Sequence, residues 1–206
     1  MTKNFFLRFF SSIFLAPLII FLIYSGKYYF FLLLLMISII SIYETFQLKK
    51  TTIKLVICLL LFSFTFSAIE IINKINGNYI ILNIFFLTCL SDIGGYFFGK
   101  IFGGKKIKII SPNKTYFGFL GSILFALLGC YAANILGWQL GNDIFLNYFF
   151  VFICTLVVIF GDLLFSYFKR KCLIKDFSNF IPGHGGLLDR IDGLIVLTVF
   201  VYFIIK

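Results

Sequence analysis

The acidic and basic side chains of this sequence gather in one stretch, from Asp162 to Asp192, between two strongly apolar runs. This stretch holds four of the eight acidic residues, the single histidine and five of the eighteen lysines and arginines. If the apolar run before Asp162 is a helix that continues, Asp162, Ser166 and Lys169 share one face, because residues four and seven apart stack on a helix. Asp189 and Asp192, three residues apart, share a face in the same way. This is the composition of a reactive site.

The residue types indicate what the site handles. Carboxylates at helix ends are hard-oxygen ligands for Mg²⁺, which takes its remaining ligands from water and substrate phosphates. Between the acids lies PGHGG, residues 182–186, whose glycines let backbone N–H groups approach an anion. Acids for a metal, cations for phosphates and a glycine-rich loop together indicate phosphoryl or nucleotidyl transfer. A lone histidine is more often structural, but His184 in this loop is placed to contact a phosphate or a leaving group, with no proton transfer assigned to it.

At these residues the chain resembles the phosphatidate cytidylyltransferase (CDP-diglyceride synthase) family. The positions that match the family signature, at every spacing, are Ser166, Lys169, Arg170, Lys175, Asp176, Ser178, Ile181, Pro182, His184, Gly185, Gly186, Asp189, Arg190 and Asp192. A looser similarity covers Ser91, Asp92, Tyr96, Gly99, Gly103, Ser111, Pro112, Lys114, Thr115, Gly118 and Gly121, with Asn113 and Phe117 where the family has lysine and glutamate. The resemblance covers the C-terminal half, and residues 1–80 match only in being apolar.

The resemblance implies an enzyme that transfers CMP from CTP to phosphatidic acid, giving CDP-diacylglycerol and pyrophosphate in phospholipid synthesis. Asp162, Asp189 and Asp192 would hold Mg²⁺, with or without a second cation, and would act with Lys169 as the catalytic residues. The expected substrate-binding residues are Asp92, Ser111, Lys114, Ser166, Arg170, Lys175, His184, Gly185, Gly186 and Arg190. The resemblance also implies a homodimer with a face formed by the first spans.

Two other functions use the same residue types. One is a CTP-dependent kinase of a long-chain alcohol, and the other is a carrier for an anionic solute. The sequence shows no inverted pair of broken spans, and its cations lie at one face instead of at mid-depth, so a carrier is less well supported. The product separates the three: pyrophosphate for the cytidylyltransferase, CDP for the kinase, and no nucleotide turnover for the carrier.

The elements that must position these residues are membrane helices. With 61% hydrophobic and 13% charged residues and a mean hydropathy of +1.07, the chain lies far outside soluble usage. We expect an all-α, polytopic membrane protein with about seven transmembrane helices, near residues 9–24, 28–43, 55–69, 79–98, 117–136, 145–165 and 191–205. The third and seventh runs are shorter than the ~20 residues that cross a bilayer, so they either recruit flanking residues or do not cross fully.

The distribution of charge predicts the topology. With the N-terminus in the cytoplasm, fifteen of the eighteen cations fall on the cytoplasmic side, leaving Lys27, Lys74 and Lys206 outside. The formal charge of +10 therefore indicates membrane lipid as a partner, and not nucleic acid. We expect a bacterial-type inner membrane, with the active site facing the cytoplasm, where a nucleotide is available. The first apolar run resembles a signal peptide, but no small-residue cleavage site follows it, so we expect it to be retained.

The chain divides into two parts. Residues 1–80 are expected to be spans without identifiable chemistry, with Glu44 and Glu70 as interfacial carboxylates. Residues 81–206 are expected to form a catalytic region with cytoplasmic loops at 99–116 and 166–190. Asp92 lies inside the fourth span, where a carboxylate is costly, so we assign it a functional role over one in helix assembly. The glycines and alanines of the fifth span predict tight helix packing.

Overall fold

The computed structural model describes residues 17–107, 111–135, 143–178, 180 and 185–206. Six long helices dominate these residues: α2 (Lys27–Phe46), α3 (Thr51–Asn73), α4 (Gly77–Ile101), α5 (Tyr116–Ile135), α6 (Ile144–Lys171) and α7 (Leu188–Ile205). Residues 17–24 are also helical. The strands β1 (Lys106–Ile107) and β2 (Ser111–Thr115) pair antiparallel between α4 and α5, with Lys106 opposite Thr115. The sequence did not predict this small ribbon.

The helices confirm an all-α, polytopic membrane protein. Five of those in the described residues are long and apolar enough to cross a bilayer: Lys27–Phe46, Thr51–Asn73, Gly77–Ile101, Tyr116–Ala133 and Ile144–Lys171. The short third run does recruit flanking residues, because α3 is 23 residues long. Helix α7 has 18 residues, about 27 Å at 1.5 Å per residue, and it begins with the charged residues of the signature.

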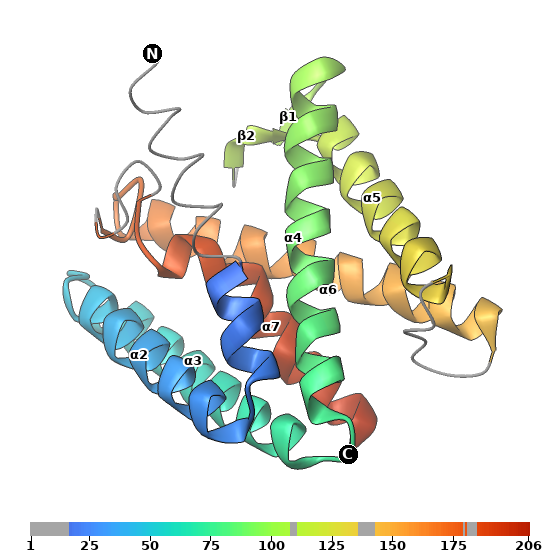
Figure 1. Ribbon diagram of the computed structural model, residues 1–206. Coiled ribbons are helices and arrows are strands. Elements are labelled where there is room, and N and C mark those ends of the chain that lie inside the picture. The colour runs from blue at the N-terminus through green and yellow to red at the C-terminus, as the bar shows by residue number, and fades with distance from the viewer. Residues whose placement is uncertain (1–16, 108–110, 136–142, 179, 181–184) are drawn as a thin grey trace.

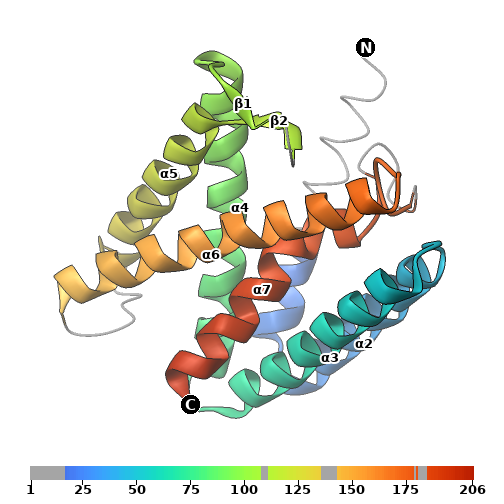
Figure 2. The ribbon, with the colours of Figure 1, turned by 180° about the vertical axis from the view of Figure 1, so that it is seen from behind.

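The helices are arranged in two groups (Figures 1 and 2). Helices α2 and α3 lie side by side, and α3 packs against α7, while α4 and α5 converge at the end that carries the β1–β2 ribbon. Helix α6 contacts α4, α5 and α7 and so joins the groups. Ile57, Ile195 and Leu197 are fully buried in the common core, whereas Phe62 and Phe145 point outward, as side chains facing lipid do.

Helices α4 and α5 approach each other through glycines. A methyl group added at Gly94 or Gly121 would overlap backbone of the opposite helix, and one added at Gly95 would lie 2.6 Å from Ser122 Oγ. The Ser122 hydroxyl donates a hydrogen bond to the Ser91 carbonyl at 2.7 Å and ties the helices together. This confirms the tight packing that the small residues of the fifth span predict.

A second close approach joins α6 and α7. A Cβ built on Gly161 would lie 3.0 Å from Gly193 Cα, and one built on Gly193 would lie 3.0 Å from Asp162 Oδ1. Each glycine is next in sequence to an aspartate, Asp162 or Asp192. The absence of side chains at this crossing therefore brings the two aspartates of different helices near each other.

Candidate active site

A cavity of about 450 Å³ opens where the C-terminal halves of α4 and α6 meet β2 and the starts of α5 and α7. Its charged lining residues are Asp92, Asp162, Asp189, Asp192, Lys100, Lys114, Lys169 and Arg190. A concentration of ionisable groups in a chain this apolar indicates a functional site, since each such group is costly within a membrane unless it is used. The cavity collects residues that are a hundred positions apart in the sequence.

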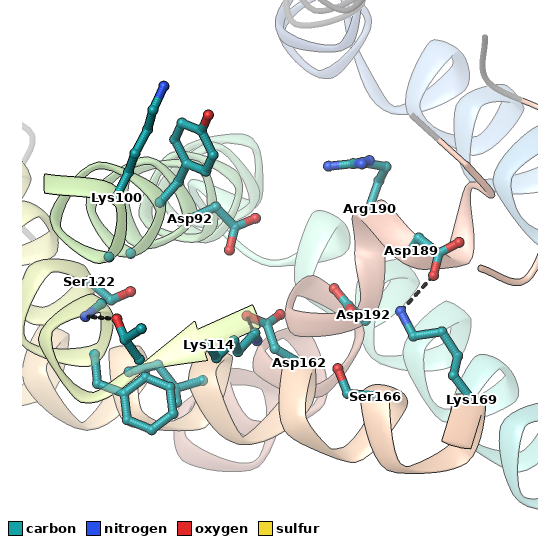
Figure 3. Close-up of a pocket in the computed structure, with 17 residues that line it drawn as sticks. Asp92, Lys100, Lys114, Ser122, Asp162, Ser166, Lys169, Asp189, Arg190 and Asp192 are labelled. Carbon is teal, nitrogen blue, oxygen red and sulfur yellow. Dashed lines mark hydrogen bonds and ion pairs between the residues drawn. The ribbon is translucent and has the colours of Figure 1, made fainter. Parts of the chain in front are cut away.

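Three carboxylates from three helices face this space. Figure 3 shows Asp92 of α4, Asp162 of α6 and Asp192 of α7 directed into the same cavity. One oxygen of Asp192 accepts a hydrogen bond from the Gly193 N–H at 2.9 Å, which fixes the orientation of that carboxylate. Carboxyl groups of three different helices are therefore brought to one cavity.

Lys114 connects the ribbon to one of these carboxyl groups. It comes from β2, and its Nζ lies 2.7 Å from Asp162 Oδ2, with side-chain exposures of 29% and 17%. Lys114 of the loop 99–116 was expected to bind substrate, and it contacts one of the expected metal ligands, Asp162. Lys114 therefore brings an ammonium group of β2 into the cavity.

Asp189 organises the segment that leads into α7. Its Oδ1 lies 2.7 Å from Lys169 Nζ, and its Oδ2 accepts hydrogen bonds from the backbone N–H groups of Phe177 and Gly186, both at 3.0 Å. The side chain is 6% exposed. A carboxylate holds about four lone-pair positions, and three of them are engaged here. Asp189 thus ties α6, the loop and α7 together at the edge of the cavity.

Eight of the residues expected at the site line the cavity: Asp92, Lys114, Asp162, Ser166, Lys169, Asp189, Arg190 and Asp192. Asp162, Ser166 and Lys169 do share one face of a single helix, as their spacing predicts. Arg170 and Lys175 are exposed and do not line the cavity, and neither do Gly185 and Gly186. His184 and the side chain of Ser111 lie outside the described residues.

The expectation for Glu44 is wrong. Instead of lying at an interface, its side chain is completely buried and accepts hydrogen bonds from Ser178 Oγ and from the N–H groups of Leu187 and Leu188. An interfacial position was predicted because Glu44 comes near the end of an apolar run, and nothing in its own helix indicates a partner more than 130 residues away. Lys100, in the last turn of α4, also lines the cavity; its place at the start of the lysine-rich stretch 100–114 was the one signal for it.

Comparison with known proteins identifies the family. A model of the cytidylyltransferase family matches residues 49–206. The chain belongs to this family. A phosphatidate cytidylyltransferase of Rickettsia bellii is 36% identical over 211 residues, which cover 98% of this chain and 91% of that protein. The matched range includes every residue that lines the charged cavity.

Other relatives in the cytidylyltransferase family are longer. A phosphatidate cytidylyltransferase of Helicobacter pylori is 39% identical over 144 residues, covering 68% of this chain and 53% of that protein. One from Bacillus subtilis is 39% identical over 133 residues, covering 60% and 48%. The chain thus matches about half the length of these two relatives and nearly the whole length of the Rickettsia protein.

Proposed function

We propose that this chain transfers the cytidylyl group of CTP to phosphatidate, giving CDP-diacylglycerol and pyrophosphate. Membership of the cytidylyltransferase family and the names of the relatives support this reaction over the kinase and the carrier. The observation that carries the proposal is the cavity itself, in which Lys114, Lys169 and Arg190 stand among four carboxylates. Such an arrangement suits a polyphosphate bound together with a divalent cation.

The helices that line the cavity also offer room for a lipid. A second cavity, of about 590 Å³, lies between α4, α5 and α6 farther from the ribbon, and nearly all of its lining residues are apolar, among them Leu90, Phe125 and Val151. On α4 and α5 the residues that line this apolar cavity come within three positions of those that line the charged one, whereas on α6 the two sets are separated by the stretch between Val151 and Ile159. An amphipathic substrate with a phosphate head and hydrocarbon chains fits this sequence of polar and apolar surfaces.

The donors present fit Mg²⁺. Asp162, Asp189 and Asp192 line one cavity, and carboxylate oxygens are the hard ligands that this ion uses. In the described part of the chain no three His, Cys, Asp or Glu side chains are grouped closely enough to hold a metal by themselves. Mg²⁺ does not require such a cage, because it keeps several waters and takes oxygens from substrate phosphates. Bound there, it would neutralise charge on the nucleotide phosphates.

The reaction depends on the positioning of the two substrates more than on proton transfer. An oxygen of the phosphatidate phosphate attacks the α-phosphorus of CTP, and the bond to pyrophosphate breaks. Because that nucleophile is already anionic near neutral pH, the protein needs no strong general base. Lys114, Lys169 and Arg190 would supply positive charge to the attacking phosphate and to the departing pyrophosphate, where charge develops during the transfer.

We propose further that the cavity opens to the cytoplasm of a bacterial-type inner membrane. One support is that fifteen of the eighteen lysines and arginines fall in segments predicted to be cytoplasmic. The other is that residues of segments 99–116 and 166–190 line one cavity. A homodimer with a face formed by the first spans stays an expectation of the family resemblance. Crosslinking of the purified protein in nanodiscs would give a dimer band under that expectation and a monomer band otherwise.

The product of turnover tests the proposal. Purified protein with CTP, phosphatidate and Mg²⁺ should release pyrophosphate in a 1:1 ratio with CDP-diacylglycerol. Release of CDP with a phosphorylated lipid would show a kinase instead. Binding of the nucleotide or the lipid by folded protein without any turnover would contradict an enzymatic function altogether.

A further inference from the structure

Glu44 is a buried carboxylate that lies outside the part of the chain matched by the family model, which begins at residue 49. It comes from α2, close to the end of that helix, and it reaches the segment that precedes α7. Its Oε1 accepts hydrogen bonds from Ser178 Oγ at 2.6 Å and from the Leu187 N–H at 2.7 Å. Its Oε2 accepts one from the Leu188 N–H at 2.8 Å. A side chain of α2 is thereby hydrogen-bonded to the segment that leads into α7 and to the first residue of that helix.

The start of α7 needs such a partner. The first N–H groups of a helix have no carbonyl within the helix to bond, and a side chain of the N-cap residue usually accepts from one of them. Here the N-cap residue is Leu187, whose side chain has no acceptor and makes no capping bond. The carboxylate of Glu44 supplies the acceptors from another helix, and its negative charge is favourable at a helix N-terminus.

The contact also fixes the residues on either side. A Cβ built on Gly186 would lie 3.0 Å from both carboxylate oxygens of Glu44, so the chain passes close against the acid there. The Gly186 N–H in turn bonds Asp189, whose other oxygen holds Lys169. Asp189 follows Leu188 directly, so the bond between Glu44 and the Leu188 N–H helps to set how the first turn of α7 is oriented toward the cavity.

We propose that Glu44 is a positioning residue for the cytidylyl transfer, holding the start of α7 so that Asp189, Arg190 and Asp192 face the cavity. The proposal rests on the proposed function for its kinetic consequences and on the contacts of Glu44 alone for its structural ones. It assigns to the N-terminal spans a role in the reaction, although none of residues 17–80, the part of them that the structure describes, lines the charged cavity.

The substitution Glu44→Gln removes the negative charge and one acceptor oxygen while it keeps the size of the side chain. All three partners of the carboxylate are donors, and two of them are backbone N–H groups that cannot reverse their polarity. The Gln amide has one oxygen and one NH₂ group, so at least one of those N–H groups loses its acceptor while the side-chain volume stays the same. Ser178→Ala removes one bond of the three and leaves the carboxylate in place.

Two control variants separate this role from a loss of stability. Ile71→Ala opens the core at a buried residue near the end of α3, where the neighbouring Lys74 donates a hydrogen bond to the Ile205 carbonyl at the other end of α7 from residues 185–192. Glu70→Gln repeats the substitution at an exposed acid on α3. All variants carry the whole chain and are compared in one detergent. Thermal unfolding, kcat and the Mg²⁺ concentration that gives the half-maximal rate are measured for each. Amide hydrogen exchange of residues 185–192 is measured in the absence of metal.

Glu44→Gln should speed exchange of residues 185–192 at least tenfold, lower kcat at least tenfold and raise the Mg²⁺ requirement at least threefold. Ser178→Ala should lower kcat about threefold, and it keeps the test decisive if Glu44→Gln does not fold. Ile71→Ala should lower the unfolding temperature yet leave the exchange of residues 185–192 and the Mg²⁺ requirement within twofold, and Glu70→Gln should match the starting protein. Normal exchange and kcat in Glu44→Gln and Ser178→Ala, or the same changes in Ile71→Ala, would overturn the proposal. The exchange arm does not depend on turnover, so it remains valid even if the chemistry assigned to the cavity fails.

Discussion

Lys114 and Lys169 each place an ammonium group on a carboxylate that we expect to share in holding Mg²⁺. The pairs are Lys114 with Asp162 and Lys169 with Asp189, both at 2.7 Å. Because the same lysines are expected to bind phosphates, metal and nucleotide would arrive at acids and cations that already neutralise each other. The two pairs differ in one respect: Asp189 also holds two backbone N–H groups, whereas no such bond is described for Asp162.

Asp162→Asn should therefore damage turnover without damaging the fold. The substitution keeps the side-chain volume but removes the charge that a metal ion and Lys114 require, so we expect kcat to fall about 100-fold, as for the loss of one electrostatic group at a reacting phosphate. Added Mg²⁺ should restore it only in part. Asp143→Asn, an exposed residue at the other end of α6, is the matched control. Pyrophosphate release measures both, and near-normal turnover of Asp162→Asn would remove Asp162 from the metal site.

Asp189→Asn should lower stability as well as turnover. With the Asn oxygen toward Phe177 and Gly186, the NH₂ group faces the Lys169 ammonium; with the amide turned round, both backbone N–H groups lose their acceptor. In either orientation a buried donor is left without an acceptor, which costs about 1–3 kcal/mol. The unfolding temperature of this variant should lie clearly below that of Asp162→Asn in the same detergent. Equal unfolding temperatures would show that Asp189 does not organise the loop before α7.

At the scale of the elements, the sequence predicts what one helix contains and not which helices meet. The face shared by Asp162, Ser166 and Lys169 follows from helical spacing, and the apolar runs mark the helices near their observed positions. The pairing of Lys114 with Asp162 has no such signal, because no periodicity encodes which residues of different helices approach. Glu44 was misplaced for the same reason. The β1–β2 ribbon is too short to show the alternation that marks a strand.

The glycine contact between α4 and α5 carries an element-scale prediction. A Cβ at Gly121 would overlap Phe98 Cβ and the Gly94 carbonyl, neither of which can rotate away. Gly121→Ala should thus push the helices apart, at a cost of about 1–3 kcal/mol, or a fall of at least about 2 °C in unfolding temperature. Gly129→Ala is the comparison, because there the Cβ would meet the end of the flexible Leu90 side chain. A smaller effect for Gly121→Ala than for Gly129→Ala would contradict the close crossing.

At the scale of the whole molecule, the meeting of the two loops at one cavity requires that they lie on one side of the membrane. Cysteines placed at the exposed positions Lys105 and Lys175, in a background without the five native cysteines, should react with an impermeant reagent from the cytoplasmic side of inverted vesicles. A cysteine at Ile75, which is 92% exposed between α3 and α4, should react from the other side. Labelling of positions 105 and 175 from opposite sides would make the assembled cavity impossible in a membrane.

The measurement closest to the central claim follows the α-phosphorus of the nucleotide. With purified protein, Mg²⁺, phosphatidate and CTP labelled at the α-phosphate, label should enter the lipid phase in step with pyrophosphate release. The rate should be at least tenfold above that with ATP, a difference of about 1.4 kcal/mol in activation free energy. Equal rates with ATP would leave a phosphate and metal site without its specificity for cytidine. Pyrophosphate release without phosphatidate, with all label left in water, would contradict the transfer of a cytidylyl group to lipid.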